Sequence, residues 1–371
     1  MDVASAEFLL ARLERENQAL ALNPKTILVQ DGALRADQST LKEIALTSTT
    51  YSTKAPTENG EASDGTDVDF WSSIVSDYAS TLHKIPHLLT AKVRAGIPPH
   101  LRSQIWSTMS GAQTERFASL YPLLLNEDSP FDRIIKRDIP RTFPKLSMFK
   151  DEGGEGQMKL YRLLKGYSIY DADVGYCQGL SFVVGPLLLQ DMSEVEAFAV
   201  FVRLMEDAPP PKKANSNVPH HPHRSYALRT LFTPQMTGLH LMLYQLTELV
   251  RLHLPALFAH FADHGVTSTM YASQWFLTLF TYNFPLPLVF RIFDIIFAEG
   301  AAETMLRFSL AILRRNEERL LMEPDFDGVL LLLKGQELYA VYADDPERVV
   351  KDAMGVHDWV SEAGLAEMRV G

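Results

Sequence analysis

Apolar residues recur at helical spacing along most of the chain from Val68 onward. The first run follows Asp67 and Asp69, either of which can cap a helix, and it places four large apolar side chains on one face. Because no Asn-Gly turn joins two alternating runs, the sequence predicts an all-α fold. The four apolar residues are Phe70, Trp71, Ile74 and Tyr78. Later runs predict helices at residues 160–170, 177–189, 194–205, 235–252, 270–280, 286–297 and 303–315.

The two ends of the chain and one internal segment have a different composition. Residues 5–22 predict a short docking or packing helix, and the Ser-, Thr-, Gly- and Asp-rich residues 45–69 predict a flexible linker. Residues 209–223 are rich in proline, which predicts a loop. We expect a flexible N-terminal arm over 1–66, a helical domain over 67–335 and a helical C-terminal extension over 336–371. Short helices over 326–370 are expected to break at Gly335, Pro346 and Gly355.

Composition narrows the class of protein. The 371 residues carry a net charge of −11, which argues against nucleic acid as the main partner because phosphate binding needs clustered positive charge. The single cysteine, Cys177, excludes an internal disulfide and fits a reducing compartment. The first residues lack a signal-peptide pattern, and no apolar run approaches the roughly 18 residues that a membrane-spanning helix needs. We therefore expect a cytoplasmic protein.

The sequence lacks the motifs with which proteins hold nucleotides or zinc. It has no Gly-Lys dipeptide, which excludes a G-x-x-x-x-G-K-[ST] loop, and it has no G-x-G-x-x-G. His260 and His264 are four apart, but Phe261 replaces the glutamate of an H-E-x-x-H site. Cys177 lies among apolar residues, which predicts a buried and inert thiol. We expect this chain to bind no nucleotide, metal or cofactor of its own.

Two polar residues stand at unusual positions. Arg141 lies between Pro140 and Pro144, and Asp138 is the last polar helical position before Pro140. Because a residue before a proline is disfavoured in the α region, we expect Ile139 to leave that region and Arg141 to lie on a stiff loop. Gln178 falls at the expected start of the apolar helix at 177–189. Each side chain has a structural interpretation, an ion pair for the arginine and a helix-end hydrogen bond for the glutamine. Each also suits contact with a phosphoryl group held by another protein.

Three short motifs occur in order along the chain. They are R-x-x-x-W at residues 102–106, I-x-x-D-x-x-R at 135–141 and Y-x-Q at 176–178. Together with Gly96-Ile97-Pro98 before them and the segments 271–280 and 291–300 after them, they make the sequence similar to the TBC-domain family of Rab GTPase activators. The resemblance covers roughly residues 67–335, and it implies the helical TBC fold.

The resemblance also implies a catalytic pair. Arg141 would act as an arginine finger, and Gln178 would act in place of the GTPase's own glutamine. Both would be supplied in trans to a Rab protein in its GTP form, so GTP and Mg²⁺ are carried by the partner. The alternative is a catalytically silent Rab-binding scaffold that uses the same surface.

The other motif residues have supporting roles in this interpretation. Asp138 is expected to hold either Arg102 or Arg141 through a charged pair. Trp106 is expected in the core. Tyr176 either contacts the partner's switch region or packs inside the protein. Gly179 is expected where backbone or a neighbouring helix approaches closely.

The surroundings of Arg141 and the partner class complete the sequence-based expectations. Arg133, Lys136 and Arg137 form a basic edge that either attracts an acidic surface or is simply a solvated helix face. Rab proteins are membrane-associated, so membrane contact is expected to be indirect, with transient recruitment to vesicle or Golgi-type membranes.

Overall fold

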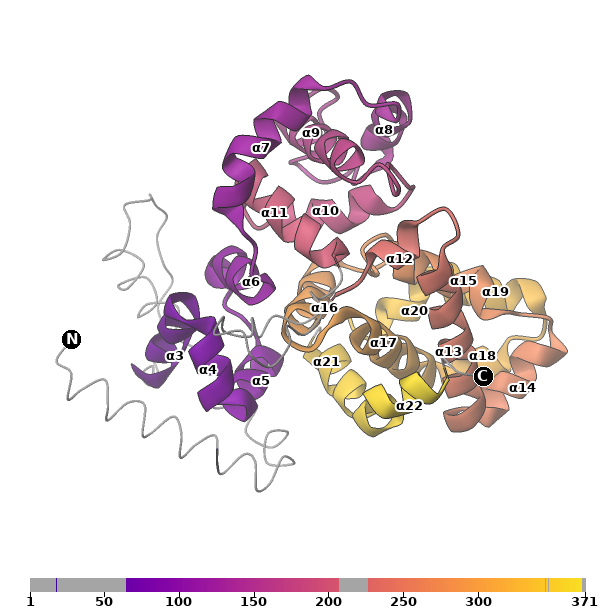
Figure 1. Cartoon of the computed structure of the whole chain (residues 1–371). Helices are drawn as coiled ribbons and strands as arrows, with labels where there is room; N and C mark the ends of the chain where they lie inside the picture. Colours follow the sequence, from indigo (N-terminus) through magenta and orange to yellow (C-terminus); the bar gives the residue numbers. More distant parts are fainter. Residues whose placement is uncertain (1–17, 19–64, 207–225, 344, 346, 369–371) are drawn as a thin grey trace. The chain divides into compact units, whose positions relative to one another are not determined.

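The computed structural model describes residues 18, 65–206, 226–343, 345 and 347–368 (Figure 1). Apart from residue 18, the predicted helix at 5–22 lies outside this part of the chain, as do residues 45–64 of the predicted linker and the predicted loop at 209–223. Every regular element within the described ranges is an α-helix or a 3-10 helix, which confirms the all-α prediction. No helix among the described residues is both long enough and apolar enough to cross a membrane.

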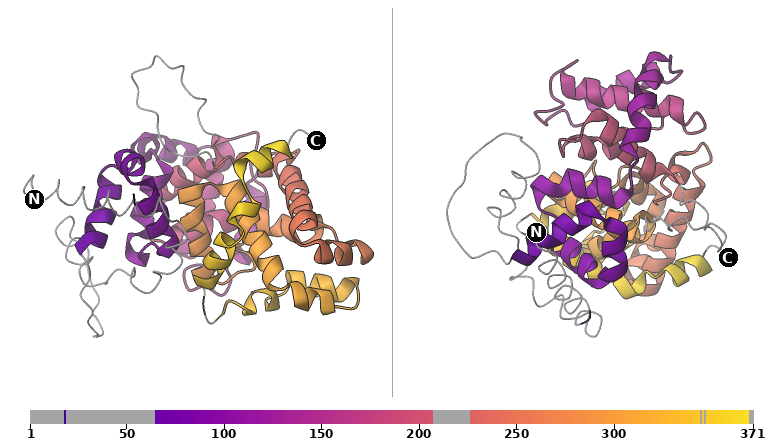
Figure 2. Two further views of the ribbon diagram at one scale, coloured as in Figure 1. Left: turned by 90° about the horizontal axis from the view of Figure 1, so that it is seen from below. Right: turned by 60° about the vertical axis from the view of Figure 1, so that its left-hand side comes forward.

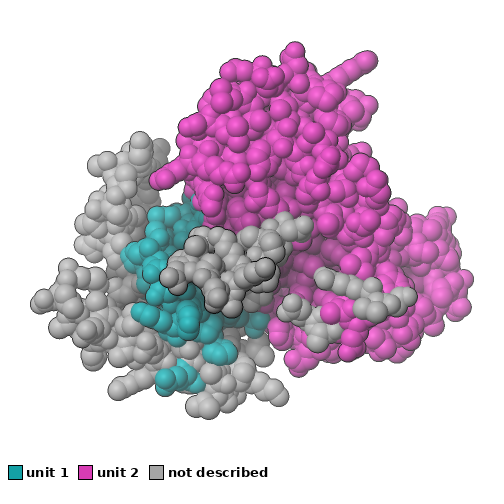
Figure 3. All heavy atoms as spheres, in the orientation of Figure 1, with its two compact units in different colours: residues 1–109, 216–223 teal, residues 110–215, 224–371 magenta. Residues whose placement is uncertain are grey.

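The chain divides into two compact units, which Figure 3 colours separately. Unit 1 comprises residues 1–109 and 216–223, and unit 2 comprises residues 110–215 and 224–371. The described helices of unit 1 are α3 (Gly65–Ser76), α4 (Tyr78–Lys84), α5 (Pro86–Ala95), η2 (Pro99–Leu101) and α6 (Arg102–Ser110), the last of which ends at the boundary with unit 2.

The start of α3 differs from the prediction. The helix begins at Gly65, so Asp67 and Asp69 lie inside its first turns and do not cap it. Residues 65–69 therefore belong to the helix, although their composition predicted a linker.

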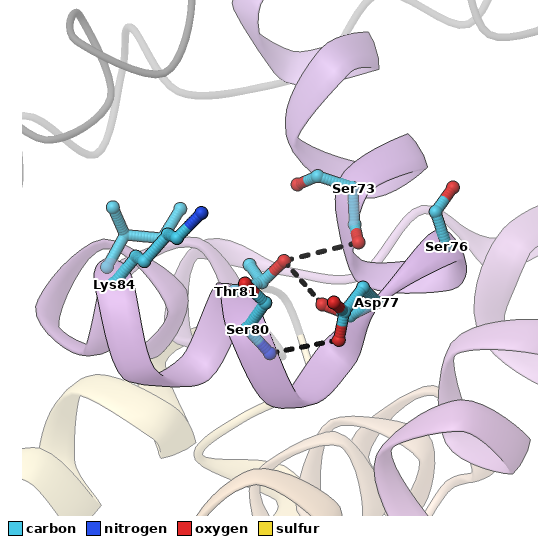
Figure 4. Close-up of a pocket in the computed structure, with 7 residues that line it drawn as sticks. Ser73, Ser76, Asp77, Ser80, Thr81 and Lys84 are labelled. Atoms are coloured by element: carbon cyan, nitrogen blue, oxygen red, sulfur yellow. Dashed lines mark hydrogen bonds between the residues drawn. The ribbon is translucent and has the colours of Figure 1, made fainter.

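The predicted first helix is in fact two helices, because the chain turns at Asp77. The Asp77 carboxylate accepts a hydrogen bond from the Ser80 backbone N–H over 3.0 Å and caps α4. Thr81 Oγ1 donates to the carbonyl oxygens of Ser73 and Asp77, at 3.2 and 2.8 Å, and closes the corner beside a small pocket between α3 and α4 (Figure 4). Tyr78 starts α4 and does not continue α3, but it is buried as its apolar character predicted.

The first half of unit 2 is a group of helices built around the apolar helix α10. In Figures 1 and 2 these helices, coloured from purple to pink, lie together. The helix α7 packs on α9 and α11, and α10 packs on α9, α11 and α16. The sequence did not predict α7, whose buried face consists of Phe117 and Tyr121 and whose interior contains Pro122. The elements are α7 (Thr114–Asn126), α8 (Asp132–Asp138), η3 (Ile139–Arg141), α9 (Glu155–Tyr170), α10 (Leu180–Leu188) and α11 (Glu194–Met205).

The second half of unit 2 packs around α16 and α17, whose side chains are mostly buried. The helix α17 packs on α13, α16 and α21, while α15 packs on α12, α13 and α19. The predicted breaks at Gly335 and Gly355 are confirmed, since α19 and α21 end immediately before them. The elements are α12 (Arg229–Phe232), α13 (Thr237–His253), α14 (Pro255–Asp263), α15 (Ser268–Leu277), α16 (Leu286–Glu299), α17 (Ala301–Arg315), α18 (Glu317–Met322), α19 (Phe326–Lys334), α20 (Glu337–Ala340), α21 (Glu347–Met354), η4 (His357–Trp359) and α22 (Glu362–Glu367).

Candidate functional site

Arg141 is the last residue of the 3-10 turn η3, which follows α8 without a gap. The prediction that Ile139 leaves the helical region is wrong, because its φ and ψ are −52° and −53°. Pro140 fits here because the first turn of a helix needs no backbone donor from it. The chain becomes extended only at Thr142, whose N–H closes the turn on the Ile139 carbonyl over 3.0 Å. Arg141 therefore ends a rigid turn.

Thr142 fixes this turn to helix α10. Its side chain is buried, and Oγ1 lies 3.0 Å from the Asp138 carbonyl oxygen and 2.9 Å from Ser181 Oγ. Ser181 is itself buried in the first turn of α10. A buried hydroxyl that makes two hydrogen bonds allows little movement, because either bond would be lost without a compensating contact with water.

Phe143 makes a second attachment to α10. Its φ is +55°, an unusual value for a residue with a bulky side chain. Its ring lies so close to Gly185 that a Cβ atom on that glycine would be 2.2 Å from it. The ring packs edge-on against Phe182 and stacks on Phe149, with centroid distances of 5.1 and 5.5 Å. The segment after Arg141 is therefore held by packing as well as by hydrogen bonds.

Gln178 lies just before α10 and not inside it, which corrects the predicted helix at 177–189. The helix begins at Leu180, and Gly179 is its N-cap with φ of +111°, a conformation that L side chains rarely adopt. A Cβ atom on Gly179 would lie 2.8 Å from the Leu277 carbonyl oxygen at the end of α15. The glycine therefore lets the Gln178 turn sit directly against the end of a neighbouring helix.

Tyr176 connects the glutamine segment to the arginine segment. The ring is buried, and its hydroxyl donates to Asp138 Oδ2 over 3.2 Å. Burial and the adjacent Asp138 carboxylate raise the pKa of Tyr176, so the phenol stays protonated and remains a donor. Asp138 also contacts Arg137 Nε at 3.6 Å. Within unit 2 the Asp138 carboxylate therefore binds Tyr176 and does not pair with Arg141, one of the two arginines that it was expected to hold.

The loop before Tyr176 is anchored on both sides. Asp171 receives two hydrogen bonds from the Arg229 guanidinium, at 2.7 and 2.8 Å, and one from the Tyr167 hydroxyl at 3.0 Å. Burial would raise the pKa of Asp171, but these bonds outweigh it and hold the pKa below its usual value. Gly175 has φ of +57°, and a Cβ atom there would overlap the ring of Phe131. The loop therefore packs against the start of α8.

These contacts bring the two predicted catalytic side chains into one constrained region. Arg141 lies between Asp138 and Thr142 in the sequence, and Gln178 lies between Tyr176 and Ser181. Tyr176 is hydrogen bonded to Asp138, and Thr142 is hydrogen bonded to Ser181. Both predicted side chains are exposed. Neither makes a hydrogen bond or ion pair within the part of the chain that the structure describes, which leaves a guanidinium and an amide available to a ligand outside the protein. Among the described residues, the structure shows neither an ion pair of Arg141 nor a helix-end hydrogen bond of the Gln178 side chain.

Arg102 and Trp106 belong to unit 1 and are both buried. Arg102 is 7% exposed, and its guanidinium donates to the Ile97 carbonyl oxygen over 3.1 Å. Trp106 is fully buried, as expected for a core residue. Their burial gives them a structural place in α6, with Arg102 tying the helix to the turn before it.

Two of the three residues of the basic edge beside Arg141, Lys136 and Arg137, contact carboxylates within the protein. Lys136 Nζ lies 2.6 Å from an Asp132 carboxylate oxygen and 5.2 Å from the centre of the Tyr161 ring, while Arg137 contacts Asp138. Asp132 also accepts a hydrogen bond from the Tyr161 hydroxyl. The edge therefore resembles an ordinary solvated helix face more than a strongly positive docking surface.

The thiol and the unit 1 pocket offer no competing site. Cys177 is half-buried, and burial raises the pKa of its thiol, which fits the predicted inert cysteine. None of the predicted site residues lines the pocket of Figure 4. The hydroxyls of Ser73, Ser76 and Thr81 are all bonded to backbone carbonyl groups there.

Sequence reasoning missed the residues that hold the site together. Thr142 and Ser181 carried no recognisable signal in the sequence, because a threonine and a serine 39 positions apart are not paired by any local rule. Phe143 and Gly185 were missed for the same reason. A positive φ at Phe143 could not have been anticipated from its side chain.

Comparison with known proteins places this arrangement in a family. The sequence profile of the Rab-GTPase-TBC domain matches residues 99–321, more than half of the chain. The human Ecotropic viral integration site 5 protein homolog is 37% identical over 322 residues, covering 87% of this chain and 36% of that protein. The GTPase-activating protein GYP5 of Saccharomyces cerevisiae is 40% identical over 276 residues, covering 74% of this chain and 28% of its own length. The chain thus spans about a third of the length of these two relatives.

Solved structures agree on the fold. The Chlamydomonas flagellar RabGAP TBC domain superimposes with a TM-score of 0.58 at 23% identity, covering 77% of this chain and 95% of that one. The Ypt/Rab-GAP domain of Gyp1p superimposes with a TM-score of 0.61 at 18% identity, covering 78% and 99%. With its sequence profile and this helical fold, the chain belongs to the Rab-GTPase-TBC domain family.

Proposed function

We propose that this chain is a GTPase-activating protein for a Rab-type small GTPase in its GTP form, to which it supplies Arg141 and Gln178. The observation that carries the proposal is that these two side chains are exposed and unpaired within the described residues, on segments joined by the Asp138–Tyr176 and Thr142–Ser181 hydrogen bonds. Relatives named as GTPase-activating proteins support the same activity.

Arg141 would stabilise the charge that develops during phosphoryl transfer. A guanidinium supplied in trans at the transferred phosphoryl group accelerates hydrolysis by roughly 10³–10⁵. The rigid turn η3 suits this role, because little conformational entropy is lost when a side chain on a fixed backbone engages its target. The planar fork of arginine also binds phosphate oxygens at two points, which lysine cannot reproduce.

Gln178 would position the water that attacks the γ-phosphate. Its amide offers both donors and an acceptor, so one side chain can hold a water and a phosphate oxygen together. In this proposal it acts in place of the GTPase's own glutamine. The close contact of Gly179 with α15 supports its backbone, so the amide starts from a defined place.

The partner would provide everything else that the reaction needs. GTP and Mg²⁺ belong to the Rab protein, and the chain needs no cofactor of its own. Contact with membranes would be indirect, through the Rab protein, with a cytoplasmic pool recruited transiently to vesicle or Golgi-type membranes. The domain bounds of 67–335 and the C-terminal extension from 336 remain predictions.

Single-turnover GTP hydrolysis across a panel of GTP-loaded Rab proteins tests the proposal. Wild type should accelerate hydrolysis by at least one Rab, and Arg141→Ala and Gln178→Ala should each lose most of that acceleration while still binding the same Rab. Binding without acceleration by wild type would favour the silent scaffold. A chain that neither binds nor accelerates any Rab in the panel would overturn the proposal.

A further inference from the structure

The turn between α15 and α16 presents one aromatic ring to solvent while its neighbours are buried. Tyr282 is 55% exposed, whereas Phe280 is fully buried and Phe284 is 5% exposed. Single exposed aromatic residues are ordinary on protein surfaces. Tyr282 differs because the backbone of its turn is fixed and because its ring packs against Phe182.

The backbone of this turn is fixed before any partner arrives. Leu279 and Phe280 have φ of +46° and +65°, and such strained residues persist only where the surroundings enforce them. Thr278 Oγ1 donates to the Gln274 carbonyl oxygen over 2.7 Å and accepts from the Tyr282 N–H over 3.4 Å. Tyr282 therefore projects from a rigid base, which lowers the entropy cost of using its ring in an interface.

The turn adjoins both segments that carry the proposed catalytic pair. The Tyr282 ring packs edge-on against Phe182 at 5.2 Å, and Phe182 packs edge-on against Phe143 at 5.1 Å, two residues after Arg141. At the end of α15, the carbonyl of Leu277 lies against Gly179, the residue that follows Gln178. The exposed ring thus continues the surface from which Arg141 and Gln178 project.

The chemistry of this surface identifies the kind of contact it suits. No charged residue occurs from position 277 to 290 or from 178 to 189. The exposed side chains of the turn and of the start of α16 are Tyr282, Pro285 and Pro287. A rigid aromatic ring on segments without charged residues fits an apolar patch, since a charged group placed against it would lose water without gaining a partner on these segments.

We propose that Tyr282 is a binding residue for the GTPase, packing against an apolar patch on the Rab surface beside the nucleotide site. The inference rests on the proposed function, because the position of the patch follows from where Arg141 and Gln178 must reach. The ring would contact the GTPase equally in the bound complex and in the transition state, so it contributes to affinity and not to the chemical step.

The test measures binding and turnover separately for Tyr282→Ala. Its Kd for the cognate Rab locked in the GTP state should rise about tenfold, as for an aromatic residue at an interface, and KM should rise with it while kcat is unchanged. Tyr282→Phe should behave as wild type, because the proposed contact is apolar. Tyr282→Arg keeps an aliphatic stem over Phe182 but should bind as weakly as Tyr282→Ala, because it places a charge in the contact.

Tyr244→Ala is the matched control. Tyr244 is 46% exposed on α13, which packs on α12, α14, α15 and α17, and its loss should change neither Kd nor KM. Equal thermal unfolding of wild type and Tyr282→Ala would exclude a folding defect. The inference is overturned if Tyr282→Ala and Tyr282→Arg both bind as wild type to a Rab that wild type activates, or if kcat falls with KM unchanged. Absence of all Rab binding by wild type would instead overturn the proposed function as well.

Discussion

The Thr142 hydroxyl donates a hydrogen bond to the Ser181 hydroxyl over 2.9 Å, inside the protein and 39 positions away in sequence. Thr142 follows the exposed Arg141, and Ser181 lies in the helix that follows the exposed Gln178. The bond is therefore a structural link between the two parts of the proposed site. Its loss tests whether the relative position of those parts matters.

Thr142→Val should reduce both stability and GTPase activation. Valine has a similar shape but no hydroxyl, so Ser181 Oγ and the Asp138 carbonyl each lose a partner, and the free energy of unfolding should fall by about 1–3 kcal/mol. Misplacement of the arginine turn should lower the single-turnover rate by about 10–100-fold, since displacements near 1 Å have effects of this size. Denaturant unfolding and GTP hydrolysis give the two quantities.

Ser181→Ala and the double variant separate coupling from general damage. If the hydrogen bond causes both effects, the double variant should lose less free energy of unfolding, and less activation expressed as a free energy, than the sum of the losses in the two single variants. A Thr142→Val protein that is destabilised but activates the Rab at the wild-type rate would mean that the link serves stability alone.

Arg141→Lys should abolish most activation without changing stability. The wild-type guanidinium is exposed and has no hydrogen bond or ion pair within the described ranges, so its loss leaves no buried group without a partner. The rate should fall nearly as far as in Arg141→Ala, by roughly 10³–10⁵, because lysine lacks the planar fork. Parallel unfolding curves and single-turnover assays check both halves, and near-normal activity of the lysine variant would contradict the proposed arginine finger.

Gly179→Ala should destabilise the protein more than Gly153→Ala. Both glycines have positive φ, at +111° and +68°, so each substitution introduces backbone strain, which is typically about 1–2 kcal/mol in the left-handed region. A Cβ atom at Gly179 would also press on the Leu277 carbonyl at 2.8 Å, whereas nothing lies within 4 Å of one at Gly153. Equal losses in denaturant unfolding would show that the contact with α15 can relax.

Asp171→Asn should change how stability depends on pH. Burial raises the pKa of Asp171, but bonds from Arg229 and Tyr167 bring it below the ordinary value of 3.8. A lowered pKa in the folded state means that the carboxylate stabilises the fold above pH 3.8 and that this contribution is lost as the pH falls through the folded-state pKa. The difference in free energy of unfolding between wild type and Asp171→Asn should therefore be largest near neutral pH and shrink below pH 3.8.

Asp173→Asn is the control for that pH dependence. Asp173 also contacts the Arg229 guanidinium, at 2.9 Å, but its side chain is 87% exposed. Exposed pairs contribute little, so this variant should be close to wild type at every pH. Matching pH profiles for the two variants would contradict a specific role for Asp171.

The sequence predicted those features that depend on neighbours along the chain. The helical period of apolar residues gave α11 with the bounds observed and α16 within two residues, because side chains three and four positions apart share one face. It failed at Asp77, where an aspartate cap interrupts an otherwise continuous apolar face. It failed again at Ile139, which was expected to leave the helical region but keeps helical backbone angles and begins a 3-10 turn that accommodates Pro140.

By itself, therefore, the sequence determined the helical class, the motifs of the TBC family, and Arg141 and Gln178 as candidate catalytic residues. Only the tertiary structure decided that Asp138 holds Tyr176, that Thr142 meets Ser181, and where the ring of Tyr282 lies. The physical reason is the range of the interactions. Helix periodicity comes from residues within one turn of each other, whereas contacts between positions 38 or 39 apart exist only after whole helices have packed.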